Sequence, residues 1–238
     1  GGLAVGSYSV DVSTADDALS GNLTVTPPPT ATVDDLDIAE KGVEATIAQG
    51  VEGDVSVNVT HDGDNESYDV FPVTLAIGQT VEVTTNTSEL RGTFSERVTF
   101  ENVTGGLALG NYNVTVSTAT DEVAGNLSVV QPPETTLDSL DIAGAGADAT
   151  ITEGDDEDVD VDVTNVGEIA GTFDVTLEVG GSVTEVETVA DVAPDETRTV
   201  TFAGVTGALP SGQHEVTVST ADDLVTGNLT VEAPPEPA

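Results

Sequence analysis

The sequence predicts an all-β protein made of tandem immunoglobulin-like β-sandwich domains. Three observations lead to this fold class: hydrophobic and polar residues alternate along many short segments, Gly, Asp, Asn and Pro separate those segments, and one sequence pattern occurs three times. Alternation with a period of two places the hydrophobic side chains of a strand on one face. About seven such strands in about 100 residues are typical of an immunoglobulin-like sandwich. No segment shows a helical period.

The repeated pattern defines the domain organisation. It occurs at residues 6–15, 110–119 and 212–221. Its spacing predicts two complete repeats of about seven strands, residues 30–133 and 134–238. Residues 1–29 match only the last part of a repeat. We therefore expect them to form the C-terminal hairpin of a truncated repeat, or a hairpin that is donated to a neighbouring subunit.

Alternating hydrophobic residues mark the strands of each repeat in order. In the first repeat they lie at residues 55–59, 73–77, 98–100, 112–116 and 127–129, and in the second at 159–163, 173–179, 200–202, 214–218 and 229–231. The chain has no Trp or Cys, so Val, Leu, Ile and a few Phe must form the core. Tyr8 and Tyr112 stand where a tyrosine corner would bond nearby backbone. His214 replaces them in the last repeat, which indicates a structural role for this histidine.

Proline-rich segments separate or end the predicted domains, at residues 26–30, 131–134 and 233–238. Consecutive prolines favour the extended polyproline conformation. We therefore expect short, stiff linkers between domains, an arrangement that does not favour a compact two-domain enzyme.

The chain is strongly acidic. It has 44 Asp and Glu residues against 4 Lys and Arg, a formal net charge of -40. Such a surface repels itself at low ionic strength, whereas the Debye length falls to about 3 Å at 1 M salt. The near absence of lysine points to a halophilic source, with a calcium-dependent adhesin of a lower-salt organism as the alternative. No basic patch is present to neutralise phosphates, so nucleic acid is excluded as a partner.

Asparagine is concentrated in glycosylation sequons. The candidate sites are Asn22, Asn58, Asn65, Asn86, Asn102, Asn113, Asn126 and Asn228. Eight of ten Asn residues in Asn-X-Ser/Thr sequons exceed the number expected by chance. N-linked glycans indicate an extracellular or cell-surface protein. No apolar stretch is long enough for a membrane span, so we expect no direct membrane insertion of this segment.

Two acidic clusters are candidate metal sites. Their carboxylates are Asp62, Asp64 and Glu66 in one loop and Asp155, Asp156 and Asp158 in the other. Calcium prefers six to eight oxygen ligands from such loops. Neither cluster has the fixed glycine and distal bidentate Glu of a complete calcium loop. The alternative is a diffuse association of cations with the acidic surface, without a specific site. We find no triad, phosphate loop or zinc spacing, and the sequence predicts a protein without enzymatic activity or a cofactor.

The second repeat resembles a known family. Segments 161–167, 171–179, 192–202 and 212–218, with the turn Asn165-Val-Gly, are similar to the cell-adhesion-related (CARDB-type) immunoglobulin-like repeat of secreted haloarchaeal and bacterial proteins. The similarity covers most of residues 134–238 and, more weakly, 30–133, where the turn becomes His61-Asp-Gly. The Trp often found in the family is absent. The resemblance implies a surface-displayed β-sandwich and no shared catalytic residues.

Together these features favour a structural protein of the cell exterior of a halophile, which self-associates into an extracellular filament, surface layer or stalk. The alternatives are an adhesin that binds a carbohydrate or a protein, a spacer for a catalytic domain elsewhere, and a viral fibre or decoration protein of a halophilic host. Tyr68 and Phe71, beside the long loop, are the aromatic residues that a binding module would expose.

Overall fold

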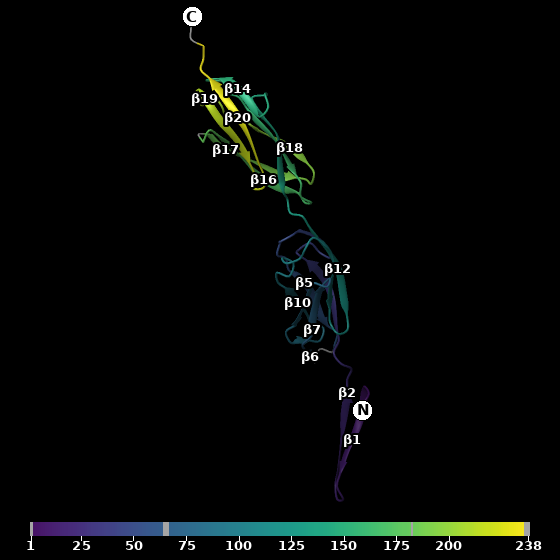
Figure 1. Ribbon diagram of the computed structural model, residues 1–238. Helices are drawn as coiled ribbons and strands as arrows, with labels where there is room; N and C mark the ends of the chain where they lie inside the picture. Colours follow the sequence, from purple (N-terminus) through teal and green to yellow (C-terminus); the bar gives the residue numbers. More distant parts are fainter. Residues whose placement is uncertain (1, 64–66, 182, 236–238) are drawn as a thin grey trace. The chain divides into compact units, whose positions relative to one another are not determined.

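The computed structural model of the chain describes residues 2–63, 67–181 and 183–235. All regular secondary structure in these residues is β-strand, with twenty strands in chain order (Figure 1). The predicted all-β class is therefore confirmed. The chain divides into two compact units, which we describe one at a time: the first comprises Gly1–Thr46, Glu52–Leu107 and Asn111–Ser128, and the second Ile47–Val51, Ala108–Gly110 and Val129–Ala238.

The first unit begins with a hairpin of β1 (Gly6–Ser13) and β2 (Ala18–Val25), which form a two-stranded antiparallel sheet. Thr14 closes its turn: the Thr14 amide donates to the Asp17 carbonyl at 2.7 Å, and the Asp17 amide donates to Thr14 Oγ1 at 3.2 Å. Thr118 and Thr220 donate in the same way to the carbonyls of Asp121 and Asp223, both at 2.9 Å. The threefold sequence pattern thus folds into the same hairpin turn each time.

The first unit also contains a β-sandwich. Its strands are β3 (Ala31–Ile38), β4 (Glu44–Ala48), β5 (Val55–His61), β7 (Pro72–Ile77), β8 (Val81–Asn86), β10 (Ser95–Phe100), β11 (Gly110–Ser117) and β12 (Glu122–Val130), with a short ribbon of β6 (Tyr68–Asp69) and β9 (Leu90–Arg91). The ends of three of these strands, β4, β11 and β12, fall in the second unit. The principal strands form two sheets: a three-stranded sheet in the order β10-β5-β3 and a five-stranded sheet in the order β4-β12-β11-β7-β8.

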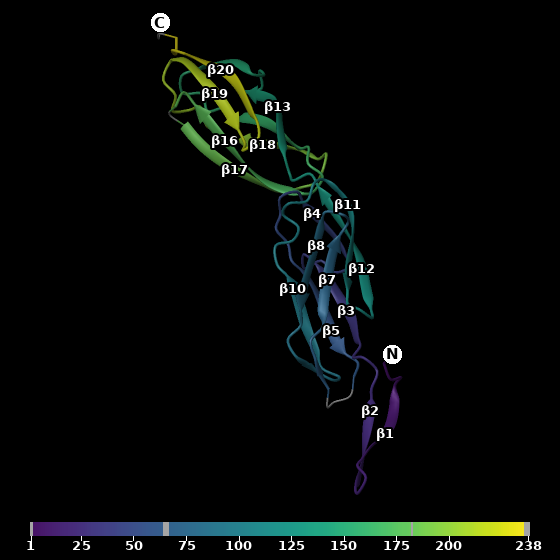
Figure 2. The ribbon, with the colours of Figure 1, turned by 60° about the horizontal axis from the view of Figure 1, so that its bottom comes forward.

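The second unit contains a sandwich of the same topology (Figure 2). Its strands are β13 (Thr135–Ile142), β14 (Asp148–Thr152), β15 (Val159–Asn165), β16 (Gly171–Val179), β17 (Val183–Val192), β18 (Thr197–Phe202), β19 (Gly212–Ser219) and β20 (Leu224–Glu232). The sheets have the orders β13-β15-β18 and β14-β20-β19-β16-β17. All ladders are antiparallel except that of β14 with β20, which is parallel.

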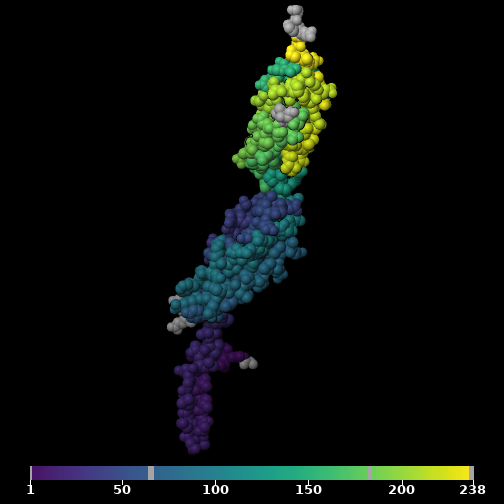
Figure 3. Space-filling model, turned by 90° about the vertical axis from the view of Figure 1, so that its left-hand side faces the viewer, coloured from purple at the N-terminus to yellow at the C-terminus, as the bar shows by residue number. Residues whose placement is uncertain are grey.

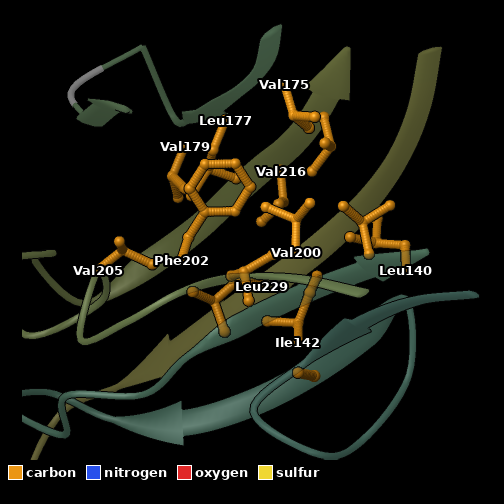
Figure 4. Close-up of a cluster of buried hydrophobic side chains, with 14 of the residues drawn as sticks. Leu140, Ile142, Val175, Leu177, Val179, Val200, Phe202, Val205, Val216 and Leu229 are labelled. Carbon is orange, nitrogen blue, oxygen red and sulfur yellow. The ribbon is translucent and has the colours of Figure 1, made fainter. Parts of the chain in front are cut away.

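The core of the second sandwich consists of aliphatic side chains around one aromatic ring. Four side chains from the five-stranded sheet are fully buried, namely those of Val175, Leu177, Val216 and Leu229 (Figure 4). Phe202 from β18 is exposed at only 1%. Every one of these positions lies on the hydrophobic side of an alternating strand. The predicted core of Val, Leu, Ile and Phe is therefore confirmed.

Each sandwich has eight principal strands among the described residues instead of about seven. The additional strands include β8 and β17 at the edge of the five-stranded sheets. Most residues of β8 are exposed, because a sheet of five strands extends beyond the three strands that face it. Val81 and Val83 alternate with Glu82 and Thr84 in β8, but this short pattern was not assigned to a strand in the sequence analysis.

The proline-rich segment before the second sandwich packs against that sandwich. The Gln131 amide donates to Glu168 Oε2 at 2.8 Å. A Cβ atom at Gly167 would lie 2.2 Å from the Pro132 carbonyl oxygen, and one at Gly171 would lie 2.4 Å from Pro133 Cβ. Glycine is therefore required at both positions so that the two prolines can approach the backbone.

Candidate interaction surfaces

The N-terminal hairpin exposes an apolar face. Val10 pairs with Gly21 and Val12 with Leu19, so the side chains of Val10, Val12, Leu19 and Leu23 lie on the same side of the sheet. Their exposed fractions are 44%, 65%, 79% and 44%. The hairpin is coloured purple in the space-filling view of Figure 3. These exposed apolar side chains on one face make the hairpin a candidate interaction surface.

The aromatic corner of the hairpin is formed as predicted. The Tyr8 hydroxyl donates to the Ala4 carbonyl at 2.7 Å, four residues back in the chain. His214 Nε2 makes the equivalent bond to the Pro210 carbonyl at 2.8 Å, also four residues back. Because a carbonyl oxygen only accepts, the His214 ring carries its proton on Nε2 for this bond. The histidine thus replaces the tyrosine as a donor.

A second histidine, His61, is completely buried at the end of β5. The Gly63 amide donates to its Nδ1 at 2.7 Å, so the proton lies on Nε2, which is 2.9 Å from Asp69 Oδ2. Asn165 is buried at the equivalent place in the second sandwich, and its Oδ1 accepts the Gly167 amide at 2.9 Å. Both side chains therefore close the same turn.

The acidic cluster in the second sandwich bonds to backbone amides. Asp155 Oδ2 accepts the Thr152 amide at 2.9 Å, Asp156 Oδ1 accepts the Gly207 amide at 3.1 Å, and Asp158 Oδ1 accepts the Gly204 amide at 2.8 Å. Three carboxylates that bond three different amides act as caps of turns.

The bond of Asp158 recurs in the first sandwich, where Asp54 Oδ1 accepts the Asn102 amide at 2.8 Å. This repetition indicates a structural role. Among the described residues, no group of three or more acidic or histidine side chains converges as a metal site would require. Asp62 is exposed, while Asp64 and Glu66 lie outside the described residues. Calcium binding at either cluster stays a prediction.

The sequon asparagines lie at the surface. Asn22, Asn86, Asn102, Asn113, Asn126 and Asn228 are exposed. Asn58 is half-buried, and its Nδ2 donates to Asp35 Oδ2 at 3.2 Å. Asn65 lies outside the described residues. Asn113 on β11 therefore faces solvent fully, and Asn58 on β5 does so in part. Glycan attachment itself stays a prediction.

The aromatic residues near the long loop differ from the expectation. Tyr68 is exposed at 56%, but Phe71 is buried at 7% and packs edge-on against His61, with ring centroids 5.0 Å apart. Phe71 is therefore a core residue, and its prediction as an exposed aromatic was wrong. Phe94, which the sequence analysis did not single out, is exposed at 56%. It follows the tight turn after β9, where the alternation that identifies strand faces is absent.

Few of the acidic side chains have a cationic partner. Arg97 lies 3.1 Å from Asp35 and 3.5 Å from Asp37, and Arg198 lies 2.8 Å from Glu196. The hydrogen bond from Arg198, followed by that from the Ala193 amide, lowers the pKa of the Glu196 carboxyl. Four basic residues against 44 acidic ones leave most of the negative charge to be balanced by solvent cations.

A carboxylate in the last hairpin turn joins two parts of the second sandwich. Asp223 Oδ2 accepts the Leu137 amide of β13 at 2.8 Å, and its Oδ1 accepts the Leu224 amide at 2.8 Å. These two bonds, that of Leu137 first, lower the pKa of Asp223. Asp121 makes the same bond to the first strand of its own sandwich, since its Oδ2 accepts the Val33 amide at 2.9 Å.

Comparison with known proteins defines the class of the second sandwich. The CARDB family model matches residues 140–228, which confirms the resemblance found in this repeat. This part of the chain is an immunoglobulin-like module of an adhesion-type or structural kind. The described residues include no helix that is long and apolar enough to cross a membrane.

The chain is also similar to solved structures at low sequence identity. CBD12 from CALX1.2 is 10% identical with a TM-score of 0.32, over 74% of this chain and 77% of that chain. The I-band fragment I67-I69 from titin is 14% identical with a TM-score of 0.32, over 97% of this chain and 75% of that chain. No curated protein matches the chain.

Proposed function

We propose that the protein is a structural component of the cell exterior of a halophile, which assembles through its immunoglobulin-like repeats into an extracellular filament, surface layer or stalk. One observation carries the proposal: two sandwiches of the same topology occur in a chain that has 44 acidic residues and four basic ones. A repeated fold supplies extended surface for contacts between molecules. The CARDB match over residues 140–228 supports a module of this kind.

The charge supports the halophilic part of the proposal. The formal net charge of -40 is spread over two small domains, so electrostatic repulsion opposes folding wherever salt does not screen it. At about 1 M salt the screening length is roughly 3 Å, shorter than the separation of most surface charges. The same composition that destabilises the fold in dilute buffer is therefore tolerated in brine and keeps the protein soluble there.

The distribution of sequons supports assembly. The first repeat has six sequons, whereas Asn228 is the single one in the second. Asn58 and Asn113 of the first repeat correspond to Asp162 and Glu215 of the second. A repeat without glycans on these faces leaves protein surface accessible to neighbouring molecules. We place the larger intermolecular contact on the second repeat for this reason.

The positions of the two histidines support a non-enzymatic function. His61 is buried and bonds the turn at Gly63 and the carboxylate of Asp69, and His214 bonds the Pro210 carbonyl. Each ring thus has a structural role within its own sandwich. Ser67 Oγ lies 3.2 Å from His61 Nε2, but that nitrogen carries the ring proton because Nδ1 accepts the Gly63 amide, so in this tautomer His61 does not take a proton from Ser67.

Electron microscopy of the native material in molar salt tests the proposal. We expect filaments, a lattice or cell-attached stalks, with repeating domains along them. Dispersed single molecules under the same conditions would contradict assembly. Fractionation of the culture separates cells from virus particles, and recovery of the protein with virions would favour the alternative of a viral fibre.

An adhesin is the second candidate, and the exposure of two aromatic side chains favours it. Tyr68 and Phe94, each exposed at 56%, flank the loop that follows His61. Exposed aromatic rings stack on sugars and anchor protein partners. Binding to a glycan array in molar salt that disappears in the double substitution Tyr68→Ser, Phe94→Ser would support this function.

A further inference from the structure

We propose that the first sandwich binds a neutral sugar ring in a pocket between the proline-rich segment before β3 and the loop that follows β5. The inference deepens the second candidate function, an adhesin, on which it rests, because it identifies the class of ligand and the residues that bind it. It is drawn from a comparison of this loop with the equivalent turn of the second sandwich.

In the second sandwich, prolines fill the equivalent place. A Cβ atom at Gly167 would lie 2.2 Å from the Pro132 carbonyl oxygen, and one at Gly171 would lie 2.4 Å from Pro133 Cβ. The two glycines therefore leave room that the proline-rich segment occupies.

In the first sandwich, a side chain occupies the room that Gly171 leaves. Phe71 corresponds to Phe173, and their rings are buried to a similar extent, with exposed fractions of 7% and 8%. Counted from these rings, Asp69 corresponds to Gly171. Pro29, the counterpart of Pro133, cannot pack in the same way, because Asp69 has a Cβ atom and a carboxylate.

A pocket of about 480 Å³ lies at this place in the first sandwich. Its lining includes residues 26–30, the turn after β5, and both residues of β6. The loop segment 62–70 is also two residues longer than its counterpart 166–172. The volume falls within the range of about 300–1,000 Å³ that is typical of small-molecule sites. Loops of this kind often carry binding residues.

The lining combines an aromatic ring with groups that form hydrogen bonds. Tyr68 is exposed at 56% and presents its ring to the pocket. The carboxylate of Asp62 is exposed, and Asp69 keeps 29% of its side chain exposed although its Oδ2 bonds His61. Carboxylates accept hydrogen bonds, and the hydroxyl of Thr30 can both donate and accept them. A sugar ring offers the complementary groups, namely an apolar C–H face for the aromatic ring and several hydroxyls.

The charges of the pocket favour a neutral ligand. Two carboxylates repel an anionic sugar. A cationic ligand has to compete with solvent cations at molar concentration, and the screening length at about 1 M salt is roughly 3 Å. Stacking and hydrogen bonds act at direct contact, so salt weakens them less. A neutral sugar is therefore the ligand class that this pocket can retain in brine.

Binding of the methyl glycosides of glucose, galactose and mannose to the full chain tests the inference in molar salt. Saturation-transfer NMR detects the contact, and isothermal titration calorimetry measures the affinity. We expect at least one of the three to bind, and the anionic methyl glucuronide to bind at least tenfold more weakly than that glycoside.

The variant Tyr68→Ser separates the pocket from a general aromatic surface. We expect it to weaken sugar binding at least tenfold without a change of melting temperature, because Tyr68 is exposed. Phe94→Ser is the matched control: Phe94 has the same exposed fraction, 56%, and is not among the residues that line the pocket. This variant should bind as the unmodified chain does.

The variant Asp62→Asn tests the selectivity of the site. Loss of one negative charge should reduce the discrimination against the glucuronide, an effect that a purely structural role of Asp62 would not produce. Asp34→Asn, at an exposed aspartate of β3 outside the pocket, is the control and should leave the discrimination unchanged.

Sugar binding that is lost in Tyr68→Ser and kept in Phe94→Ser supports the inference. Competition by glycans released from the native protein, or by polysaccharide of the growth medium, distinguishes a ligand on neighbouring copies from one outside the assembly. Equal loss in both variants overturns the pocket and leaves the adhesin candidate intact, as does array binding without binding of any of the three glycosides. Preferential binding of tetramethylammonium overturns the assignment to a neutral sugar. Electron microscopy of the native material tests assembly independently of all these outcomes.

Discussion

A buried polar side chain closes one turn in each sandwich. Asn165 is fully buried, and its Nδ2 donates to the carbonyls of Ile169 and Val192, both at 2.9 Å, while its Oδ1 accepts the Gly167 amide. A buried donor or acceptor that loses its hydrogen-bond partner lowers the free energy of unfolding by about 1–3 kcal/mol. The amide group of Asn165 therefore joins the turn at residues 167–169 to the end of β17.

Asn165→Ala should lower the free energy of unfolding of the second sandwich by about 2–4 kcal/mol, because it leaves several buried backbone groups without partners. Denaturant unfolding in molar salt measures the change. Asn86→Ala, at an exposed asparagine, is the control and should remain within about 0.5 kcal/mol. Equal unfolding midpoints of the two variants would contradict the prediction.

Asp223 makes the second sandwich sensitive to acid. Its pKa is lowered in the folded state by the amides of Leu137 and Leu224. A carboxyl whose folded pKa lies below its unfolded pKa stabilises the fold at pH values above the unfolded value, and this contribution disappears as the pH falls through the folded value. Acidification should therefore remove the contribution of Asp223.

The melting temperature of the unmodified chain should fall between neutral pH and pH values below the usual pKa range of an aspartate. We expect this fall to be smaller in Asp223→Asn. Protonation of other carboxyls also relieves repulsion, so the comparison requires molar salt, where that repulsion is screened. Asp138→Asn, at an exposed aspartate of β13, is the control. An unchanged acid dependence in Asp223→Asn would contradict the assignment.

Sequon occupancy depends on the surroundings of each asparagine. Asn126 and Asn228 are exposed, whereas Asn58 is half-buried and bonded to Asp35. We expect glycopeptide mass spectrometry of the native protein to find lower occupancy at Asn58 than at Asn126. Full occupancy of Asn58 would show that the site is modified before the sandwich folds.

Residue roles could be predicted from the sequence where a repeat offers a comparison. Tyr8 and His214 stand at equivalent positions after the same Gly-X pair, and both form the predicted corner. Phe71 could not be assigned from the sequence, because its burial depends on contact with His61, ten positions earlier at the end of β5. It also depends on a loop whose length differs from that of the second repeat.

At the scale of the element, a hairpin needs its glycine only when other strands are present. Gly227→Val should destabilise the second sandwich by about 3 kcal/mol, since a Cβ atom would lie 2.2 Å from the Ala147 carbonyl oxygen. Gly21→Val should leave the melting temperatures of both sandwiches unchanged. Calorimetry in molar salt compares the two variants, and an equal effect would contradict the difference in surroundings.

Strands with an unbroken alternation were predictable, whereas β3 and β13 were not, because a register shift interrupts the alternation of their buried residues. The alternation at residues 173–179 identifies β16, whose inward side chains are buried. The residues of β8 are largely exposed, and only Val81 and Val83 alternate with polar residues there, a pattern too short to identify the strand. The parallel pairing of β14 with β20 joins segments about 80 residues apart, for which no local pattern exists.

At the scale of the whole molecule, charge dominates the response to solvent. Dilution of the salt from molar to tens of millimolar should lower the melting temperature markedly, because the Debye length increases several-fold and the 44 carboxylates repel each other. Differential scanning fluorimetry with an extrinsic dye measures this, since the chain has no Trp. An unchanged melting temperature would contradict the halophilic origin.

The parallel ladder between β14 and β20 also determines how the second sandwich responds to tension. Asp148 pairs with Asn228 and Thr152 with Glu232, so the two strands run in the same direction side by side. A pull on the beginning of β14 and the end of β20 loads all the bonds of this ladder in shear, and they must break together. Strands opened from one end would release their bonds one after another at lower force. A module closed in this way suits a chain that is held under mechanical load.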